Sequence, residues 1–295
     1  MTEFDLRLRA VMPAPLKVTY EALTDPAALR VWLAEHAEVD LPRTYQFWGR
    51  TTPDGAEPHQ RVLHVDERTL RLAWTVDGVE TTSQFELAED EDGTLVTLSQ
   101  SDLPSFEDVI HDRAGARGAV QTFWSLAIAN LADYLAGREL TPACDFTSSD
   151  MRTSVLIDAA PDKVFDSMVQ PEHFRRWFGA HVDIEPYVGG RFAMGGFEMD
   201  PGGAKFVEFE PGRKASLRFV DGETTTWELE GSHGKTRLTL KHSGFNPDNP
   251  PYAGWVGWLG GLAELRRYHE LPQWRSIWRS VEVAGIPESM FTIDQ

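Results

Sequence analysis

Apolar positions in the second half of the chain follow strand spacing, then helical spacing, then strand spacing again. A β-branched run at 152–158 predicts a first strand. Pro161 and Pro171 each suit the first turn of a short helix, and the apolar positions that follow them recur at helical spacing. Glycine-rich turns then separate short runs of residues up to position 243, which predicts about six antiparallel strands.

The last predicted strand and the helix after it each have one apolar face. Leu238, Leu240 and His242 alternate with polar residues, so we expect all three on one buried face of the sheet. From Trp255 to His269, apolar residues recur at helical spacing over about four turns. Such a stripe must pack against something, and the concave face of a curved sheet is the large surface available. The pattern predicts a helix held across a curved sheet, with a cavity between them.

The pattern occurs twice, at an offset of about 145 residues, and we call the two occurrences copy one and copy two. The matched segments are Val31-Trp32-Leu33 with Arg176-Trp177-Phe178, Leu72-Ala73-Trp74 with Leu217-Arg218-Phe219, and Trp124 with Trp255. We therefore expect a first domain at 1–140, a linker at 141–150 and a second domain at 151–271. After Pro272, the residues Trp274, Ile277, Trp278 and Val281 have helical spacing, which predicts an amphipathic tail helix at 272–295 that docks within the chain.

Charge and cysteine content narrow the classes of function. The 295 residues carry a net charge of −18, which argues against duplex nucleic acid or an anionic membrane as partners. Cys144 is the single cysteine, so an intramolecular disulfide and a cysteine-based zinc site are excluded, and we interpret it as an incidental thiol. We expect a cytoplasmic protein, because the sequence has no long apolar run and no secretory signal. Arginine exceeds lysine, which favours a bacterial source.

Standard catalytic motifs are absent from the sequence. It has no nucleophile elbow, no phosphate-binding loop and no dinucleotide fingerprint, and its histidines form no zinc-type pair. We therefore expect no metal, no cofactor and no catalytic residue. If the protein were an enzyme, His242, Glu198, Tyr187 and Arg191 would be the polar candidates, although nothing in the sequence pairs a nucleophile with a base.

The order of elements resembles the START-like, helix-grip superfamily, also called SRPBCC. The segments at 161–165, 176–178 and 188–192 and Gly254-Trp255 are similar to the branch named after the activator of the heat-shock-protein-ninety ATPase. The resemblance covers 150–271 well and 8–138 more loosely, since copy one has Leu41-Pro42-Arg43-Thr44-Tyr45 in place of the double-glycine turn. It implies an α+β fold of two tandem helix-grip domains, each a curved antiparallel sheet wrapped around a long C-terminal helix.

The final helices of the two copies differ in glycine content. Copy two has Gly254, Gly257, Gly260 and Gly261 where copy one has Phe123, Leu126, Ala129 and Asn130. Each glycine inside a helix costs about 1 kcal/mol relative to alanine, so something should compensate. Two explanations stay open: a close approach of the helix to the sheet, or room for a ligand in copy two.

We expect the protein to bind a small hydrophobic or aromatic molecule, mainly in copy two, although core packing also explains many of its aromatic residues. The expected lining residues are Trp177, Phe192, Met194, Phe206, Phe219, Trp227, His242, Trp255, Trp258, Leu259 and Leu262, with Trp74 and Gln100 in copy one. The resemblance implies two alternatives: a co-chaperone-like regulator of a chaperone ATPase, or a cyclase-like or hydrolase-like enzyme. A buried carboxylate paired with a histidine would favour the enzyme, and a fully packed interior would favour the regulator. The oligomeric state stays open.

Overall fold

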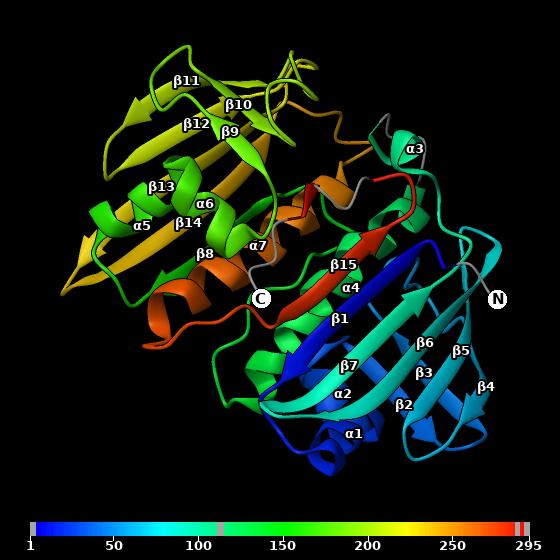
Figure 1. Ribbon diagram of the computed structural model, residues 1–295. Coiled ribbons are helices and arrows are strands. Elements are labelled where there is room, and N and C mark those ends of the chain that lie inside the picture. Colours follow the sequence, from blue (N-terminus) through cyan, green and yellow to red (C-terminus); the bar gives the residue numbers. More distant parts are fainter. Residues whose placement is uncertain (1–3, 111–114, 287–289, 292–295) are drawn as a thin grey trace. The chain divides into compact units, whose positions relative to one another are not determined.

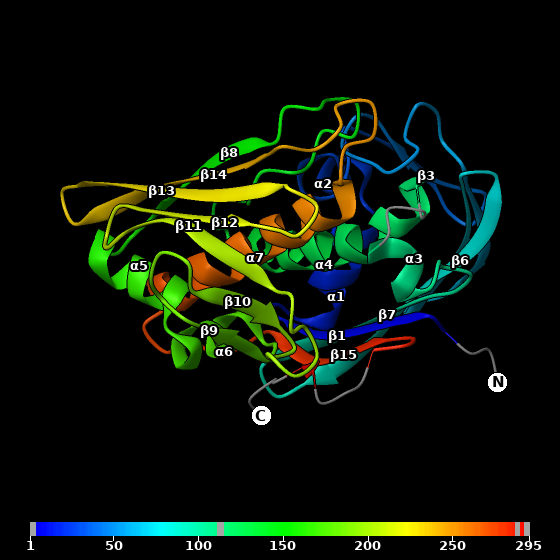
Figure 2. The same ribbon diagram turned by 90° about the horizontal axis from the view of Figure 1, so that it is seen from above.

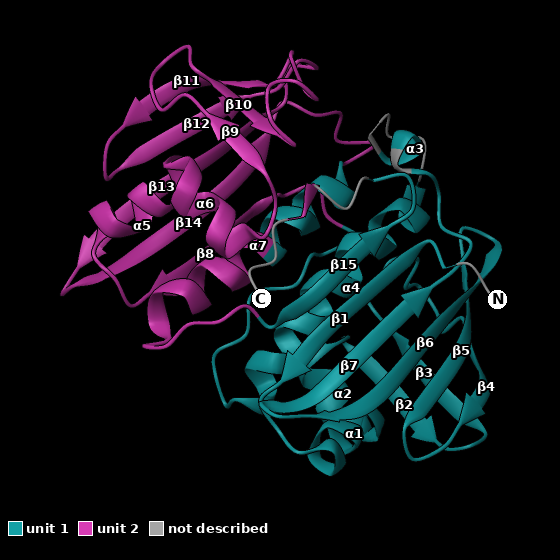
Figure 3. Ribbon diagram, viewed as in Figure 1, with its two compact units in different colours: residues 1–147, 251–260, 277–286 teal, residues 148–250, 261–276, 287–295 magenta. Residues whose placement is uncertain are grey.

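The computed structural model describes residues 4–110, 115–286 and 290–291. The chain forms two compact units, coloured separately in Figure 3. Unit 1 comprises residues 1–147, 251–260 and 277–286, and unit 2 comprises residues 148–250, 261–276 and 287–295. Each unit contains one large antiparallel sheet together with helices, so the predicted α+β fold of tandem helix-grip domains is confirmed.

Unit 1 is built on a six-stranded sheet. The strands of the whole unit are β1 (Leu6–Met12), β2 (His36–Asp40), β3 (Thr44–Trp48), β4 (Gln60–Val65), β5 (Thr69–Val76), β6 (Val79–Asp90), β7 (Gly93–Gln100) and β15 (Trp278–Val283). Its helices are α1 (Leu16–Thr24), α2 (Pro26–Trp32), α3 (Phe106–Ile110) and α4 (Gly115–Leu135). The large sheet has the order β15-β1-β7-β6-β5-β4, while β2 and β3 form a separate pair (Figure 1).

Helix α4 supplies much of the core of unit 1. Val120, Trp124, Ile128 and Leu131 recur every three or four residues along it, and all four side chains are buried. They pack with inward-facing residues of β1, β5, β6 and β7 in one continuous cluster. The helical spacing of the apolar residues therefore determines which face of α4 covers the sheet.

Unit 2 repeats the arrangement. Its elements are β8 (Arg152–Ile157), α5 (Pro161–Val169), α6 (Pro171–Phe178), β9 (Val182–Ile184), β10 (Arg191–Met194), β11 (Ala204–Glu210), β12 (Lys214–Arg218), β13 (Thr224–Ser232) and β14 (Lys235–Ser243). The sheet order is β8-β14-β13-β12-β11-β10-β9. The first strand, the two proline-initiated helices and the strands after them lie where the sequence pattern predicts them.

The long helix α7 (Tyr252–Glu270) follows β14. Its residues 252–260 group with unit 1, and its residues 261–270 group with unit 2. Within the described ranges, no helix is long and apolar enough to cross a membrane.

Register places one apolar face on the sheet of unit 2. Leu238 and Leu240 of β14 pair with Leu229 and Trp227 of β13, and His242 pairs with Thr225. All six side chains are buried. The predicted shared face of Leu238, Leu240 and His242 is therefore confirmed.

The tail is a strand, so the predicted tail helix at 272–295 is wrong over Trp278–Val283. Strand β15 pairs antiparallel with β1, with Val281 opposite Leu8, and the two strands lie side by side in Figure 2. Ile277, Trp278, Val281 and Val283 pack against the core of unit 1. The unpaired backbone groups of the β1 edge favour strand over helix, and the β-branched valines suit a strand. The tail thus docks within the chain, as we expected.

Candidate functional site

His242 lies on the inner face of the unit 2 sheet, and both of its ring nitrogens are hydrogen-bonded. Nδ1 lies 2.8 Å from Thr225 Oγ1, and Nε2 lies 2.7 Å from Glu223 Oε2. The His242 side chain is 5% exposed and that of Glu223 is 22% exposed. Phe245 stacks on the imidazole, with ring centroids 5.7 Å apart. The histidine–carboxylate pair that would favour an enzyme is present, and the other ring nitrogen is occupied by the buried Thr225 hydroxyl.

Gln100 occupies the equivalent position in unit 1. It pairs with Ser83 across the sheet, as His242 pairs with Thr225. The Gln100 amide oxygen accepts hydrogen bonds from Ser83 Oγ and, at 3.1 Å, from Trp124 Nε1. Its amide nitrogen donates to Thr81 Oγ1 at 2.6 Å. Both copies therefore place a polar side chain at this inward position and satisfy it with other side chains, one of them in each copy on the neighbouring strand.

Aromatic rings fill the interior of unit 1. Trp74 lies 5.2 Å from Phe47, 5.8 Å from Phe123 and 5.6 Å from Trp124, measured between ring centroids. Phe47 and Phe123 are stacked at 6.5 Å. Each of these side chains is at most 5% exposed. The interior of copy one is occupied by its own side chains.

Copy two lacks part of this cluster. Leu72 pairs with Ser83 as Leu217 pairs with Thr225, so Trp74 of copy one corresponds to Phe219 of copy two. Phe219 is half-buried, whereas Trp74 is 1% exposed. Phe123 corresponds in the sequence repeat to Gly254, which is exposed and has open space at the position that a Cβ would take. Trp74 and Phe123 touch in copy one, whereas copy two has the smaller ring of Phe219 at the first position and no side chain at the second, Gly254.

The other glycines of α7 differ in how closely neighbouring atoms approach them. A Cβ on Gly261 would lie 3.2 Å from the Phe178 ring and 3.5 Å from the Trp177 ring, and one on Gly257 would lie 3.6 Å from Thr122 Cγ2. A Cβ on Gly260, as on Gly254, would have no atom within 4 Å. Close approach explains Gly261, although the neighbour is α6 rather than the sheet. Close approach does not explain Gly254 or Gly260.

The predicted ligand residues lie in both units. In unit 2 are Trp177 on α6, Phe192 and Met194 on β10, Phe206 on β11, Phe219 after β12, Trp227 on β13, His242 on β14 and Leu262 on α7. Trp255, Trp258 and Leu259 lie in the half of α7 that groups with unit 1, and Trp74 and Gln100 lie in unit 1 on β5 and β7. Within unit 2, the ring centroids of Phe192 and Trp227 are 6.4 Å apart and those of Phe219 and His242 are 6.3 Å apart. The complete binding site stays a prediction.

The polar residues named for an enzyme do not converge. Tyr187 and Glu198 are exposed. Arg191 pairs with Glu185 at 3.0 Å, and its guanidinium carbon lies 3.8 Å from the centroid of the Phe197 ring. Arg191 lies on β10, four strands from His242 on β14, which at the usual strand spacing is about 19 Å along the sheet.

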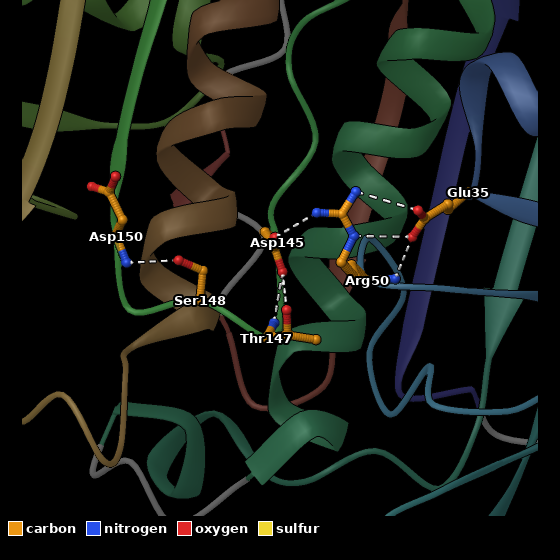
Figure 4. Close-up of polar contacts among 6 residues, drawn as sticks. All are labelled: Glu35, Arg50, Asp145, Thr147, Ser148 and Asp150. Carbon is orange, nitrogen blue, oxygen red and sulfur yellow. Dashed lines mark hydrogen bonds and ion pairs between the residues drawn. The ribbon is translucent and has the colours of Figure 1, made fainter.

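Sequence reasoning missed two cavities, which are lined by residues from separate segments. One, of about 510 Å³, lies in unit 1 beside the end of β3, and Trp48, Arg50 and Thr52 line it. Figure 4 shows Arg50 between two carboxylates: Nε lies 3.3 Å from Glu35 Oε2, and Nη1 lies 3.4 Å from Asp145 Oδ2. Hydrogen bonding to Arg50 lowers the pKa of Glu35.

The other cavity, of about 820 Å³, lies in unit 2 among α5, α6 and the end of α7. Neither cavity is lined by a predicted ligand residue. No local sequence signal could have revealed them, because their walls come from distant segments.

Burial makes Cys144 a poor candidate for a reactive centre. Cys144 is 3% exposed, and burial raises the pKa of its thiol to about 12. A buried, protonated thiol is a poor nucleophile. Within the part of the chain that the structure describes, no group of three or more His, Cys, Asp or Glu side chains could hold a metal ion.

The order of elements alone defines the class of protein. An antiparallel sheet with two short helices after its first strand and a long helix at its end, present twice, is a tandem helix-grip protein. The chain belongs to the family described as Activator of Hsp90 ATPase homolog 1-like protein, whose model matches residues 13–136 and 158–270.

Solved structures with similar folds have low sequence identity to the chain. DynU16, a protein of the dynemicin biosynthetic locus, is 16% identical with a TM-score of 0.38, over 90% of this chain and 100% of its own. The Aha1 dimer from Colwellia psychrerythraea is 17% identical with a TM-score of 0.36, over 42% of this chain and 97% of its own. An Hsp90 activator from Plasmodium falciparum is 20% identical with a TM-score of 0.29, over 33% and 74%. No curated protein matches the chain significantly.

Proposed function

We propose that copy two binds a small apolar or aromatic molecule between its sheet and α7, without covalent chemistry. The observation that carries the proposal is the replacement of the touching pair Trp74 and Phe123 by Phe219 and Gly254. In copy two Phe219 is half-buried and Gly254 is exposed, so the space that two packed rings fill in copy one would be open to another apolar group. The glycine costs about 1 kcal/mol of helix stability, which bound ligand would offset.

The chemistry of the inner face supports an apolar ligand. Phe192, Trp227 and Leu240 are apolar and each at most 2% exposed, so a molecule held among them would be enclosed by apolar side chains. His242 and Thr225 bond to one another, so they offer a ligand little unsatisfied polar surface. Apolar walls with few polar groups are typical of small-molecule sites.

A matched pair of variants tests the proposal. Gly254→Phe restores the ring of copy one, and Val220→Phe adds the same ring at a side chain that is 85% exposed. With the neutral dye Prodan as probe on the full chain, we expect Gly254→Phe to weaken binding about tenfold and Val220→Phe to leave it unchanged. Equal binding by both variants would remove the support for an interior site in copy two.

A second candidate is regulation of a chaperone ATPase, and the description of the family favours it. This role requires a surface that binds the chaperone. It also requires that both proteins share a compartment, which we propose is the cytoplasm of a bacterium. We expect the full chain to raise the ATPase rate of the Hsp90-type chaperone of its source organism, and Gly254→Phe to leave that effect intact. An unchanged ATPase rate at saturating protein would exclude this role.

A further inference from the structure

The 820 Å³ cavity of unit 2 has a cationic rim. Lys163 on α5 and Arg176 on α6 line it, and both side chains are exposed. The guanidinium carbon of Arg176 lies 5.7 Å from the centre of the Tyr268 ring, so a cation–π contact holds this charge against the cavity wall. The volume lies within the usual range for small-molecule sites, which favours a small ligand over a protein segment.

Two of the residues that line the cavity each carry a buried nitrogen atom. His269 Nε2 and Trp274 Nε1 are both inaccessible and have no hydrogen-bond partner among the described residues. Tyr268 meets both rings edge-on, at 5.2 Å and 5.1 Å between centroids. The Trp274 N–H can only donate, so an acceptor oxygen that reached it past the atoms now covering it would satisfy it. Burial first, and then the charges of Lys163 and His173, lower the pKa of His269 to about 4, so its ring is neutral near pH 7.

Two carboxylates also line the cavity. Asp158 pairs with Lys235 at 3.3 Å, which offsets its charge. Asp166 on α5 is the carboxylate that a negatively charged ligand would meet. The lining therefore carries two cations and two carboxylates, and Lys235 from outside the lining pairs with one of the carboxylates, although the whole chain has a net charge of −18.

We propose that this cavity binds a small planar molecule that carries a carboxylate, at a site separate from the interior of copy two. The carboxylate would lie between Lys163 and Arg176 and would accept from Trp274, since charge-assisted hydrogen bonds are the strongest available to it. The planar body would pack against the rings of Tyr268 and Trp274, face-on to one and edge-on to the other. This site does not depend on the proposed interior ligand.

Fluorescence titration of the full chain with 2-naphthoate tests the site, with 2-naphthamide as the neutral probe of the same shape. We expect Lys163→Gln and Arg176→Gln each to weaken naphthoate binding about fivefold and Asp166→Asn to strengthen it about threefold. Trp274→Phe, which keeps the ring packing and removes the N–H, should weaken binding about threefold. The matched controls are Lys205→Gln and Arg237→Gln, which remove exposed cations of the same unit outside the cavity.

The outcomes separate this site from the interior. Naphthoate binding that is unchanged in Gly254→Phe and depends on Lys163, Arg176 and Asp166 with these signs supports the proposal. Equal effects of the cavity and control variants would overturn it, as would equal affinity for naphthoate and naphthamide. Loss of naphthoate binding in Gly254→Phe would also overturn it, because the probe would then occupy the interior.

Discussion

Gln100 and His242 occupy the same register position in the two sheets and differ in chemistry. Gln100 is bonded to two hydroxyls and an indole, all neutral groups. His242 is bonded to a hydroxyl and a carboxylate. The position therefore requires a polar side chain with partners in both copies, and only in copy two does it place an ionisable pair at the end of the inner face.

Loss of the Gln100 amide should destabilise unit 1. Gln100→Met keeps the length of the side chain and leaves the Trp124 N–H and the Ser83 hydroxyl buried without their acceptor. We expect the free energy of unfolding to fall by about 2–4 kcal/mol, measured by urea denaturation. Gln84→Met, a half-buried position on the same sheet, is the matched control. A loss no larger than that of the control would show that the network contributes little.

His269 should make unit 2 sensitive to acid. Its pKa is lowered from 6.5 to about 4, first by burial, so the unfolded chain binds this proton more tightly than the folded chain does. Stability should therefore fall as the pH drops from about 6.5 towards 4, and the contribution is fully present above 6.5. The measurement is the melting temperature of the native chain and of His269→Gln across this range. The gap between the two should narrow or reverse in acid, and parallel curves would contradict the assignment.

At the scale of elements, β15 completes the edge of the unit 1 sheet. A chain that ends at Ser276 lacks β15 and leaves the backbone groups of β1 unpaired. We expect its melting temperature to fall by at least about 5 °C, and the exposed edge to promote self-association. Differential scanning calorimetry and light scattering measure the two effects. An unchanged melting temperature with a changed oligomeric state would instead show that the tail joins subunits.

The elements differ in how far the sequence determines them. Pro161 and Pro171 begin α5 and α6 because proline fits a first helical turn. The tail was mispredicted because Trp274, Ile277, Trp278 and Val281 also match helical spacing. Val281-Glu282-Val283 carries the alternation of a strand, but the β1 edge that decides between the two lies at the other end of the chain.

Some features of the candidate site could also be predicted from the sequence, and others could not. Alternation alone places His242 on the inner face, because the period of a strand is two. Its partner Glu223 could not be predicted, since cross-strand register depends on the turns between strands. Lys163, Arg176 and His269 come together only in the folded unit, so no spacing in the sequence brings out their cavity.

At the scale of the whole molecule, the two copies of one fold differ in the packing of their interiors. Copy one buries Trp74, Phe123 and Trp124 in a continuous aromatic cluster. Copy two has Phe219 and Gly254 in place of the first two. We propose a structural role for the interior of copy one and a binding role for that of copy two, and the family alone does not distinguish these roles.

Native mass spectrometry of the intact protein, purified gently from a rich lysate, tests this assignment most directly. The account predicts a reproducible extra mass of one small molecule per chain, retained in Val220→Phe and lost in Gly254→Phe. A bare mass under conditions that preserve weak complexes would contradict it, as would an extra mass that Gly254→Phe retains.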